Sequence, residues 1–96
     1  MRLPLFWTEE AKETFEIVTN FIHQIWGDKQ VDIFIKKAFK TLENISSQPY
    51  IFKSSSVVKN VRKGLISKQT SVFYQIESDK IVILFFWDNR QKPIID

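Results

Sequence analysis

The sequence contains no cysteine, and it has only one histidine and two glycines. Without cysteine, neither a disulfide framework nor a thiolate metal site can form, and His23 alone cannot hold a metal ion. Gly27 and Gly64 each stand apart from any other glycine, so the sequence has no phosphate-binding loop and no dinucleotide-binding fingerprint. We therefore expect no metal, no cofactor and no nucleotide-driven chemistry.

Long apolar runs are missing as well. The longest, residues 81–87, has seven residues, whereas a membrane span needs about 18 or more. The N-terminal residues lead into acidic side chains and lack the features of a cleaved leader. At 96 residues the chain has room for one hydrophobic core. We expect a single domain over residues 1–96 that is neither secreted nor embedded in a membrane, and a cytoplasmic location.

Acidic residues are unevenly distributed. Residues 1–48 carry six basic and seven acidic side chains, whereas residues 49–96 carry eight basic and four acidic ones. Between Lys53 and Thr70 there are five basic side chains and no acidic one. Such a segment indicates either an anionic partner, such as nucleic acid or an acidic protein, or a solvated surface.

Two apolar stripes at helical spacing predict a helical hairpin. The stripes, which both step by 4, 3, 4 and 3 residues, are Ala11, Phe15, Val18, Ile22 and Ile25, and then Val31, Ile35, Ala38, Leu42 and Ile45. Thr8 is the expected N-cap of the first helix, and Gly27 suits the left-handed position after its end. Asp28 is the expected N-cap of the second helix, which Pro49 terminates.

Strands are expected on both sides of this hairpin. Residues 3–7 alternate and contain Pro4, which indicates an edge strand, and three further strands are predicted near residues 61–67, 71–77 and 80–87. The apolar run 81–87 is typical of a central strand covered on both faces. The order strand, helix, helix, strand, strand, strand predicts an α+β fold in which the helical hairpin packs on one face of a mainly antiparallel sheet.

Several polar residues on the predicted sheet are candidates for a site. Arg62 and Lys63 are adjacent on one strand and so point to opposite faces, and the one on the open face could lie beside Tyr74 and hold a phosphate or stack a base. Alternatively, Arg62 and Lys63 cover the sheet with their aliphatic stems, and Tyr74 buries its ring while its hydroxyl remains in contact with water. Asp88 and Arg90 follow the last strand, where they either form a turn-stabilising ion pair or leave Arg90 free for an anionic ligand. His23, on a helix flank without a catalytic partner, is more typical of a structural residue.

These residues form a wider pattern. Its parts are Phe6-Trp7-Thr8-Glu9-Glu10-Ala11, Phe21-Ile22, the second helix closing on Pro49, Val61-Arg62-Lys63, Val72-Phe73-Tyr74-Gln75-Ile76, Ile83-Leu84 and Asp88-Asn89-Arg90-Gln91-Lys92-Pro93. With this pattern, the chain resembles the RelE/ParE superfamily of bacterial type II toxins over nearly its whole length. It is most similar to the ParE-like branch, whose members are also called plasmid stabilisation proteins.

The resemblance implies the same order of elements and a growth-inhibiting toxin that a cognate antitoxin neutralises. ParE-like toxins inhibit DNA gyrase, whereas RelE-like toxins cut messenger RNA on the ribosome with basic residues on the sheet. The arginine that RelE-like nucleases carry before the middle-strand motif falls at Ser71 here, which favours the ParE-like branch.

The resemblance and the charge pattern together leave three functions open: a ParE-like toxin that binds its target, a RelE-like endoribonuclease, or a non-toxic module that binds an antitoxin. The nuclease would use Arg62, Lys63 and Arg90 as catalytic residues. The expected target or nucleic-acid contacts are Lys59, Arg62, Lys63, Lys68, Tyr74, Asp88, Arg90 and Gln91. Phe34 and Phe39, beside the second stripe, are the candidates for antitoxin contact, since apolar side chains left exposed usually have a partner.

Overall fold

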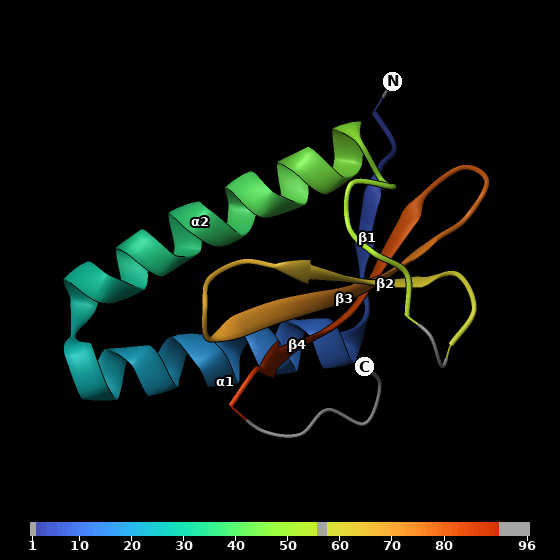
Figure 1. Cartoon of the computed structure of the whole chain (residues 1–96). Coiled ribbons are helices and arrows are strands. Elements are labelled where there is room, and N and C mark those ends of the chain that lie inside the picture. Colours follow the sequence, from blue (N-terminus) through green and yellow to red (C-terminus); the bar gives the residue numbers. More distant parts are fainter. Residues whose placement is uncertain (1, 56–57, 91–96) are drawn as a thin grey trace.

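The computed structural model describes residues 2–55 and 58–90. Its elements are β1 (Leu5–Trp7), α1 (Glu9–Trp26), α2 (Asp28–Ser47), β2 (Val61–Leu65), β3 (Thr70–Ile76) and β4 (Ile81–Asp88). Their order along the chain is the predicted one (Figure 1). The α+β fold is therefore confirmed, with strand bounds that differ from the expected ones by one or two residues.

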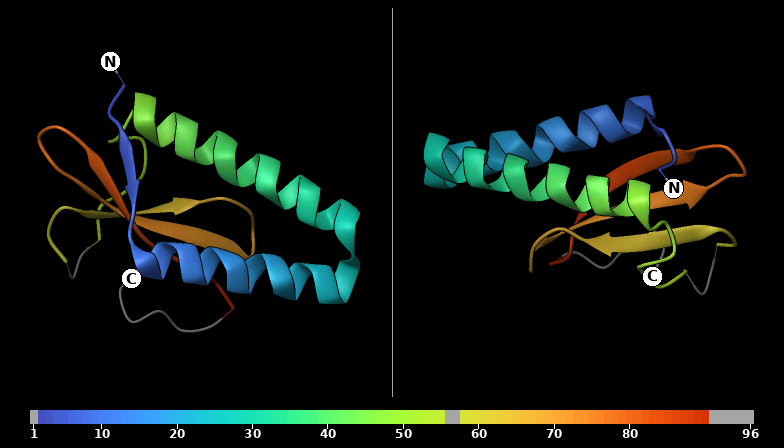
Figure 2. Two further views of the ribbon diagram at one scale, coloured as in Figure 1. Left: turned by 180° about the vertical axis from the view of Figure 1, so that it is seen from behind. Right: turned by 90° about the horizontal axis from the view of Figure 1, so that it is seen from above.

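The four strands form one mixed sheet in the order β1-β4-β3-β2. β1 pairs in parallel with β4, and the pairs β4–β3 and β3–β2 are antiparallel. β1 is an edge strand, as Pro4 indicated, and β4 is central. Both helices lie on the same face of the sheet (Figure 2).

Only the helix-facing side of β4 is fully buried. Ile81, Ile83 and Phe86 are at most 2% exposed, while Val82 and Trp87 between and beyond them are half-buried. The expectation that this strand is covered equally on both faces is therefore wrong. Its unbroken apolar run is explained in part by a β-bulge: Phe73 pairs with Phe85 and Tyr74 with Ile83, so Leu84 has no opposite residue.

Local capping and tertiary hydrogen bonds together set the helix ends. Thr8 is the N-cap of α1 as predicted, because its hydroxyl accepts from the backbone N–H of Ala11 at 2.9 Å, and the same hydroxyl donates to Leu84 O at 2.8 Å. Gly27 follows α1 with φ of 85°. The predicted N-cap role of Asp28 is wrong: Gly27 occupies that position, and the Asp28 carboxylate instead lies 2.7 Å from His23 Nε2.

The core lies between the hairpin and the sheet. Its fully buried members include Ala38, Leu42 and Ile45 of α2 and Val72 and Tyr74 of β3. Thr14 of α1 ties the helix to the sheet, since its hydroxyl accepts from the backbone N–H of Phe86 at 2.9 Å. Within the described part of the chain, neither helix is both long and apolar enough to cross a membrane.

Candidate functional site

An apolar groove of about 380 Å³ opens where the far end of the helical hairpin meets the β2–β3 turn and the end of β4. Its lining residues are Thr14, Ile17, Val18, Phe21, Ile22, Trp26, Phe34, Ser67, Gln69, Thr70, Phe86, Trp87, Asp88 and Arg90. Ile17, Phe21 and Trp26 are 65%, 41% and 51% exposed, which is unusual for such large apolar side chains. A second, more open groove adjoins it and shares Ile22, Trp26 and Phe34. We call the two together the hairpin groove.

The Asp88–Arg90 ion pair lies on the rim of the hairpin groove. Arg90 Nη2 lies 2.7 Å from Asp88 Oδ2 and Arg90 Nε lies 3.0 Å from Asp88 Oδ1, while the Arg90 backbone N–H donates to Oδ1 at 2.9 Å. The Arg90 guanidinium also lies 5.3 Å from the ring centre of Phe21. These hydrogen bonds from Arg90 lower the pKa of the Asp88 carboxyl below its usual value. Arg90 is thus held against the groove wall by the turn-stabilising pair expected as one alternative.

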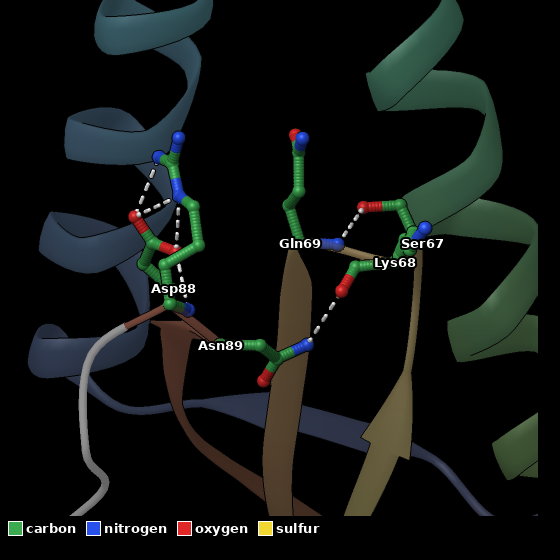
Figure 3. Close-up of polar contacts among 6 residues, drawn as sticks. Ser67, Lys68, Gln69, Asp88 and Asn89 are labelled. Carbon is green, nitrogen blue, oxygen red and sulfur yellow. Dashed lines mark hydrogen bonds and ion pairs between the residues drawn. The ribbon is translucent and has the colours of Figure 1, made fainter.

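Asn89 fixes the end of β4 to the β2–β3 turn (Figure 3). Its side-chain amide donates to Lys68 O at 3.4 Å. Its backbone N–H donates to Gln69 O at 2.8 Å, and Ser71 Oγ donates to Asn89 Oδ1 at 2.8 Å. Ser71 is fully buried. The two segments that form one wall of the groove are therefore held together, which sequence reasoning missed. The only sequence signal for this link was that Ser71 and Asn89 are polar residues at the ends of apolar strands.

A second polar cluster surrounds Arg62 at the start of β2. Arg62 Nη1 donates to Phe52 O at 2.6 Å, and its guanidinium lies 4.8 Å from the ring centre of Tyr50. Tyr74, directly opposite Arg62 on β3, donates its hydroxyl to Pro49 O at 2.7 Å. Burial raises the pKa of Tyr74 to about 12, against an opposing effect of the nearby Arg62 charge.

Tyr74 therefore does not lie on the open face of the sheet, and that expectation is wrong. Its side chain is fully buried on the helix side, because alternation along β3 places Tyr74 on the same face as Val72, in the core, and Phe73 on the opposite face beside Lys63. A target cannot contact Tyr74 in this conformation. Lys63, as expected, points away from Arg62 and lies 5.9 Å from the ring centre of Phe73.

The three candidate catalytic residues do not converge. Arg62 and Lys63 are on opposite faces of β2. Arg62 pairs with position 74 of β3, whereas Asp88, which holds Arg90, pairs with position 70. Four residues along a strand correspond to roughly 13 Å. Lys59 and Lys68 are exposed in separate turns at opposite ends of β2, and Gln91 lies outside the described residues.

The two candidates for antitoxin contact differ in exposure. Phe34 is 5% exposed and belongs to the core, so its prediction as an exposed contact is wrong. Its ring packs against Phe15, at 5.9 Å between ring centres. Phe39 is 51% exposed, although one side of its ring contacts Trp7 at 6.2 Å. Ile17 of the groove does not belong to the apolar stripe predicted for α1. Helical periodicity alone could therefore have indicated that this apolar side chain is exposed.

Comparisons with known proteins place the chain in a family. Residues 5–93 match the family described as "ParE toxin of type II toxin-antitoxin system, parDE". A search of curated proteins finds no match. Similar solved structures include the chromosomal ParDE toxin–antitoxin system from P. aeruginosa, with a TM-score of 0.76, 15% identity, and coverage of 91% of this chain and 96% of that one.

Further solved structures share the fold. The YoeB dimer from Staphylococcus aureus has a TM-score of 0.61 and 18% identity, over 88% of this chain and 94% of that one. The E. coli DinJ-YafQ toxin–antitoxin complex has a TM-score of 0.62 and 9% identity, over 94% of this chain and 96% of that one. Since the family match spans nearly the whole sequence, the chain belongs to the ParE toxin family, within the RelE/ParE superfamily of type II toxin–antitoxin toxins.

Proposed function

We propose that residues 1–96 act in the cytoplasm as one toxin domain that arrests growth by binding and inhibiting a protein target, DNA gyrase, and that a cognate antitoxin silences it. In this role the protein would serve plasmid stabilisation. The observation that carries the proposal is the separation of Arg62, Lys63 and Arg90, which are placed on two faces and at two ends of the sheet.

This separation favours binding over RNA cleavage. Stabilising the transition state of phosphodiester cleavage requires preorganised donors that converge on one phosphate. Arg62 already bonds to Phe52 O, and Arg90 is neutralised by Asp88. Ser71, at the position where the nucleases of the superfamily carry an arginine, is buried and bonded to Asn89. A bound RNA would have to break these contacts to recruit the arginines.

The hairpin groove is the surface that best suits an antitoxin. Ile17, Phe21 and Trp26 all line the groove and are all exposed, and apolar side chains that are exposed together mark interaction sites. An amphipathic segment of the antitoxin could insert apolar side chains between them, in the way that helices bind hydrophobic grooves.

The target is tested by adding the purified chain to a gyrase supercoiling assay and by mapping messenger RNA ends during growth arrest. We expect inhibition of supercoiling and intact messenger RNA. Cleavage at codon boundaries without an effect on supercoiling would instead support the endoribonuclease. Unchanged growth when the chain is expressed without its neighbouring small gene would support a non-toxic, antitoxin-binding module.

The antitoxin surface is tested with two substitutions on α1. Ile17→Asp introduces a charge into the hairpin groove, whereas Ile25→Asp introduces the same charge at a similarly exposed position outside its lining. We expect Ile17→Asp to weaken binding of the neighbouring gene product by about tenfold or more, equivalent to about 1.4 kcal/mol, and Ile25→Asp to leave it unchanged. Equal effects of the two substitutions would contradict a groove-bound antitoxin.

A further inference from the structure

The loop after α2 carries an exposed patch that neither the core nor the hairpin groove explains. Tyr50 and Ile51 are 69% and 51% exposed, and Lys53 follows them. Arg62 of β2 lies beneath Tyr50, with its guanidinium 4.8 Å from the ring centre. We call Tyr50, Ile51 and Arg62 the loop patch.

The loop patch is held in place by the sheet. Arg62 Nη1 donates to Phe52 O, and the buried Tyr74 hydroxyl donates to Pro49 O, so the backbone is tied down on both sides of Tyr50 and Ile51. The Ile51 N–H also donates to Gln48 O at 3.0 Å. An aromatic ring that is exposed yet positioned in this way loses little conformational freedom on binding. Tyrosine and arginine are also the residue types enriched in the energetic centres of protein interfaces.

The charge of Arg62 indicates the chemistry of the partner. Residues 44–76 contain five basic side chains and no acidic one. Arg62 is the one of these five that lies beneath Tyr50, and no carboxylate of the described residues pairs with it. The Ser54–Arg62 bridge places Lys53 opposite Lys63, on the other face of β2. An acidic side chain of a partner would supply the carboxylate that Arg62 lacks.

The apolar content of the patch favours a protein over RNA. Ile51 offers an aliphatic surface that cannot stack on a base, and nucleic-acid interfaces are more polar than protein interfaces. The loop that carries the patch lies at the opposite end of α2 from the turn between the helices (Figure 1). Along α2, the groove residue nearest to this loop is Lys37, which is separated from Ser47 by 10 residues, or about 15 Å of helix.

We propose that the loop patch is a second protein-docking surface, which binds an acidic segment of the toxin's target and stays accessible while the antitoxin occupies the hairpin groove. This inference rests on the proposed function in one respect, that the target is a protein. It goes further by separating the target surface from the antitoxin surface.

The test uses Tyr50→Ala in the full chain, with Tyr50→Phe as the conservative variant. Phe6→Ala is the matched control, because Phe6 is also an aromatic residue more than half exposed, and it lies 5.4 Å from a lysine, Lys80. Growth arrest, binding to purified gyrase, binding to a single-stranded RNA and binding to the antitoxin are measured for each variant. Thermal unfolding verifies that each variant folds.

We expect Tyr50→Ala to weaken growth arrest and gyrase binding by about tenfold or more while antitoxin binding stays within twofold of wild type. Tyr50→Phe should arrest growth and bind gyrase as the wild type does. Phe6→Ala should also leave growth arrest and gyrase binding unchanged.

Each other outcome has a distinct meaning. Growth arrest unaffected by Tyr50→Ala, or antitoxin binding lost with it, overturns the loop patch. RNA binding by the wild-type chain that Tyr50→Ala abolishes overturns the choice of a protein partner. If growth arrest depends on Tyr50 but the wild-type chain does not bind gyrase, the proposed target fails and the loop patch stands.

Discussion

Arg62 and Tyr74 occupy directly opposed positions on β2 and β3, and both side chains bind the backbone of the same loop. Arg62 donates to Phe52 O at 2.6 Å and Tyr74 donates to Pro49 O at 2.7 Å. The pair therefore connects the sheet to the segment that follows α2. Two residues that the sequence suggested as ligand contacts have instead a clear structural role.

The hydrogen bond from Tyr74 should contribute measurably to stability. We expect Tyr74→Phe to lower the free energy of unfolding by about 1–2 kcal/mol, because Pro49 O loses its donor without a change in packing. Tyr50→Phe, which removes a hydroxyl from an exposed ring, should change it by less than about 0.5 kcal/mol. Urea unfolding measures both. Similar values for the two variants would contradict a structural role of the buried hydroxyl.

Stability should fall at alkaline pH because of the same residue. Burial raises the pKa of Tyr74 from 10.0 to about 12. Below pH 10 the phenol is neutral in both states and its contribution is fully present. As the pH rises from 10 towards 12, the unfolded chain loses the proton first, so the free energy of unfolding falls, by an amount on the order of 2 kcal/mol.

Other groups also titrate in this range, so the measurement is a comparison with Tyr74→Phe. Urea unfolding is followed for both proteins from neutral pH to pH 12. The free energy of unfolding of the wild type should exceed that of Tyr74→Phe at neutral pH, and this difference should disappear as the pH rises to 12. A constant difference between them would mean that Tyr74 ionises as readily in the folded chain as in the unfolded one.

The contact between Thr14 and Phe86 should be required for docking α1 on β4. Thr14→Val keeps the shape of the side chain but leaves the Phe86 backbone N–H without its acceptor, so we expect a loss of about 1–3 kcal/mol. Thr19→Val is the control, because the Thr19 hydroxyl donates only to Glu16 O within its own exposed helix turn. Thermal unfolding that ranks the two variants equally would contradict this prediction.

Arg90 should control the ionisation of Asp88. In Arg90→Ala the hydrogen bonds that lower the Asp88 pKa are removed, so that pKa should rise towards 3.8. The carboxyl titration is followed by NMR. Because the folded pKa is depressed, the contribution of Asp88 to stability is present above pH 3.8 and is lost as the pH falls through the folded value.

Arg2→Ala provides the control, since Arg2 pairs with Glu43, away from Asp88. Its Asp88 titration should match that of the wild type. An Asp88 pKa that does not change in Arg90→Ala would mean that the ion pair does not form in solution.

Elements and caps whose signals are local were predictable from the sequence. The two stripes at helical spacing, the N-cap Thr8, Gly27 and Pro49 all act within a few residues of the structure that they determine. Asp28 was the exception. Aspartate is a residue type that suits an N-cap. However, α2 starts one residue earlier than predicted, so Asp28 is its first residue, and the Asp28 carboxylate contacts His23 instead of capping the helix.

The placement of site residues depended on long-range pairing. Arg62 and Tyr74 are 12 positions apart in sequence and opposed in the sheet only because of the β2–β3 register. The bulge at Leu84 of β4 changes the facing of the residues beyond it, so that Ile83 before it and Phe86 after it are both buried, and a change of one residue in register moves a side chain to the other face. No local pattern in the sequence marks that bulge.

By itself, then, the sequence determined the order of the elements, the buried stripe of each helix and the family pattern, because periodicity and capping are properties of neighbouring residues. Only the tertiary structure decided that Arg62, Lys63 and Arg90 lie apart, that Tyr74 and Phe34 are buried, and that Ile17 and Tyr50 are exposed. These outcomes depend on strand register and on how the hairpin is packed on the sheet, which are set by contacts between residues far apart in the chain.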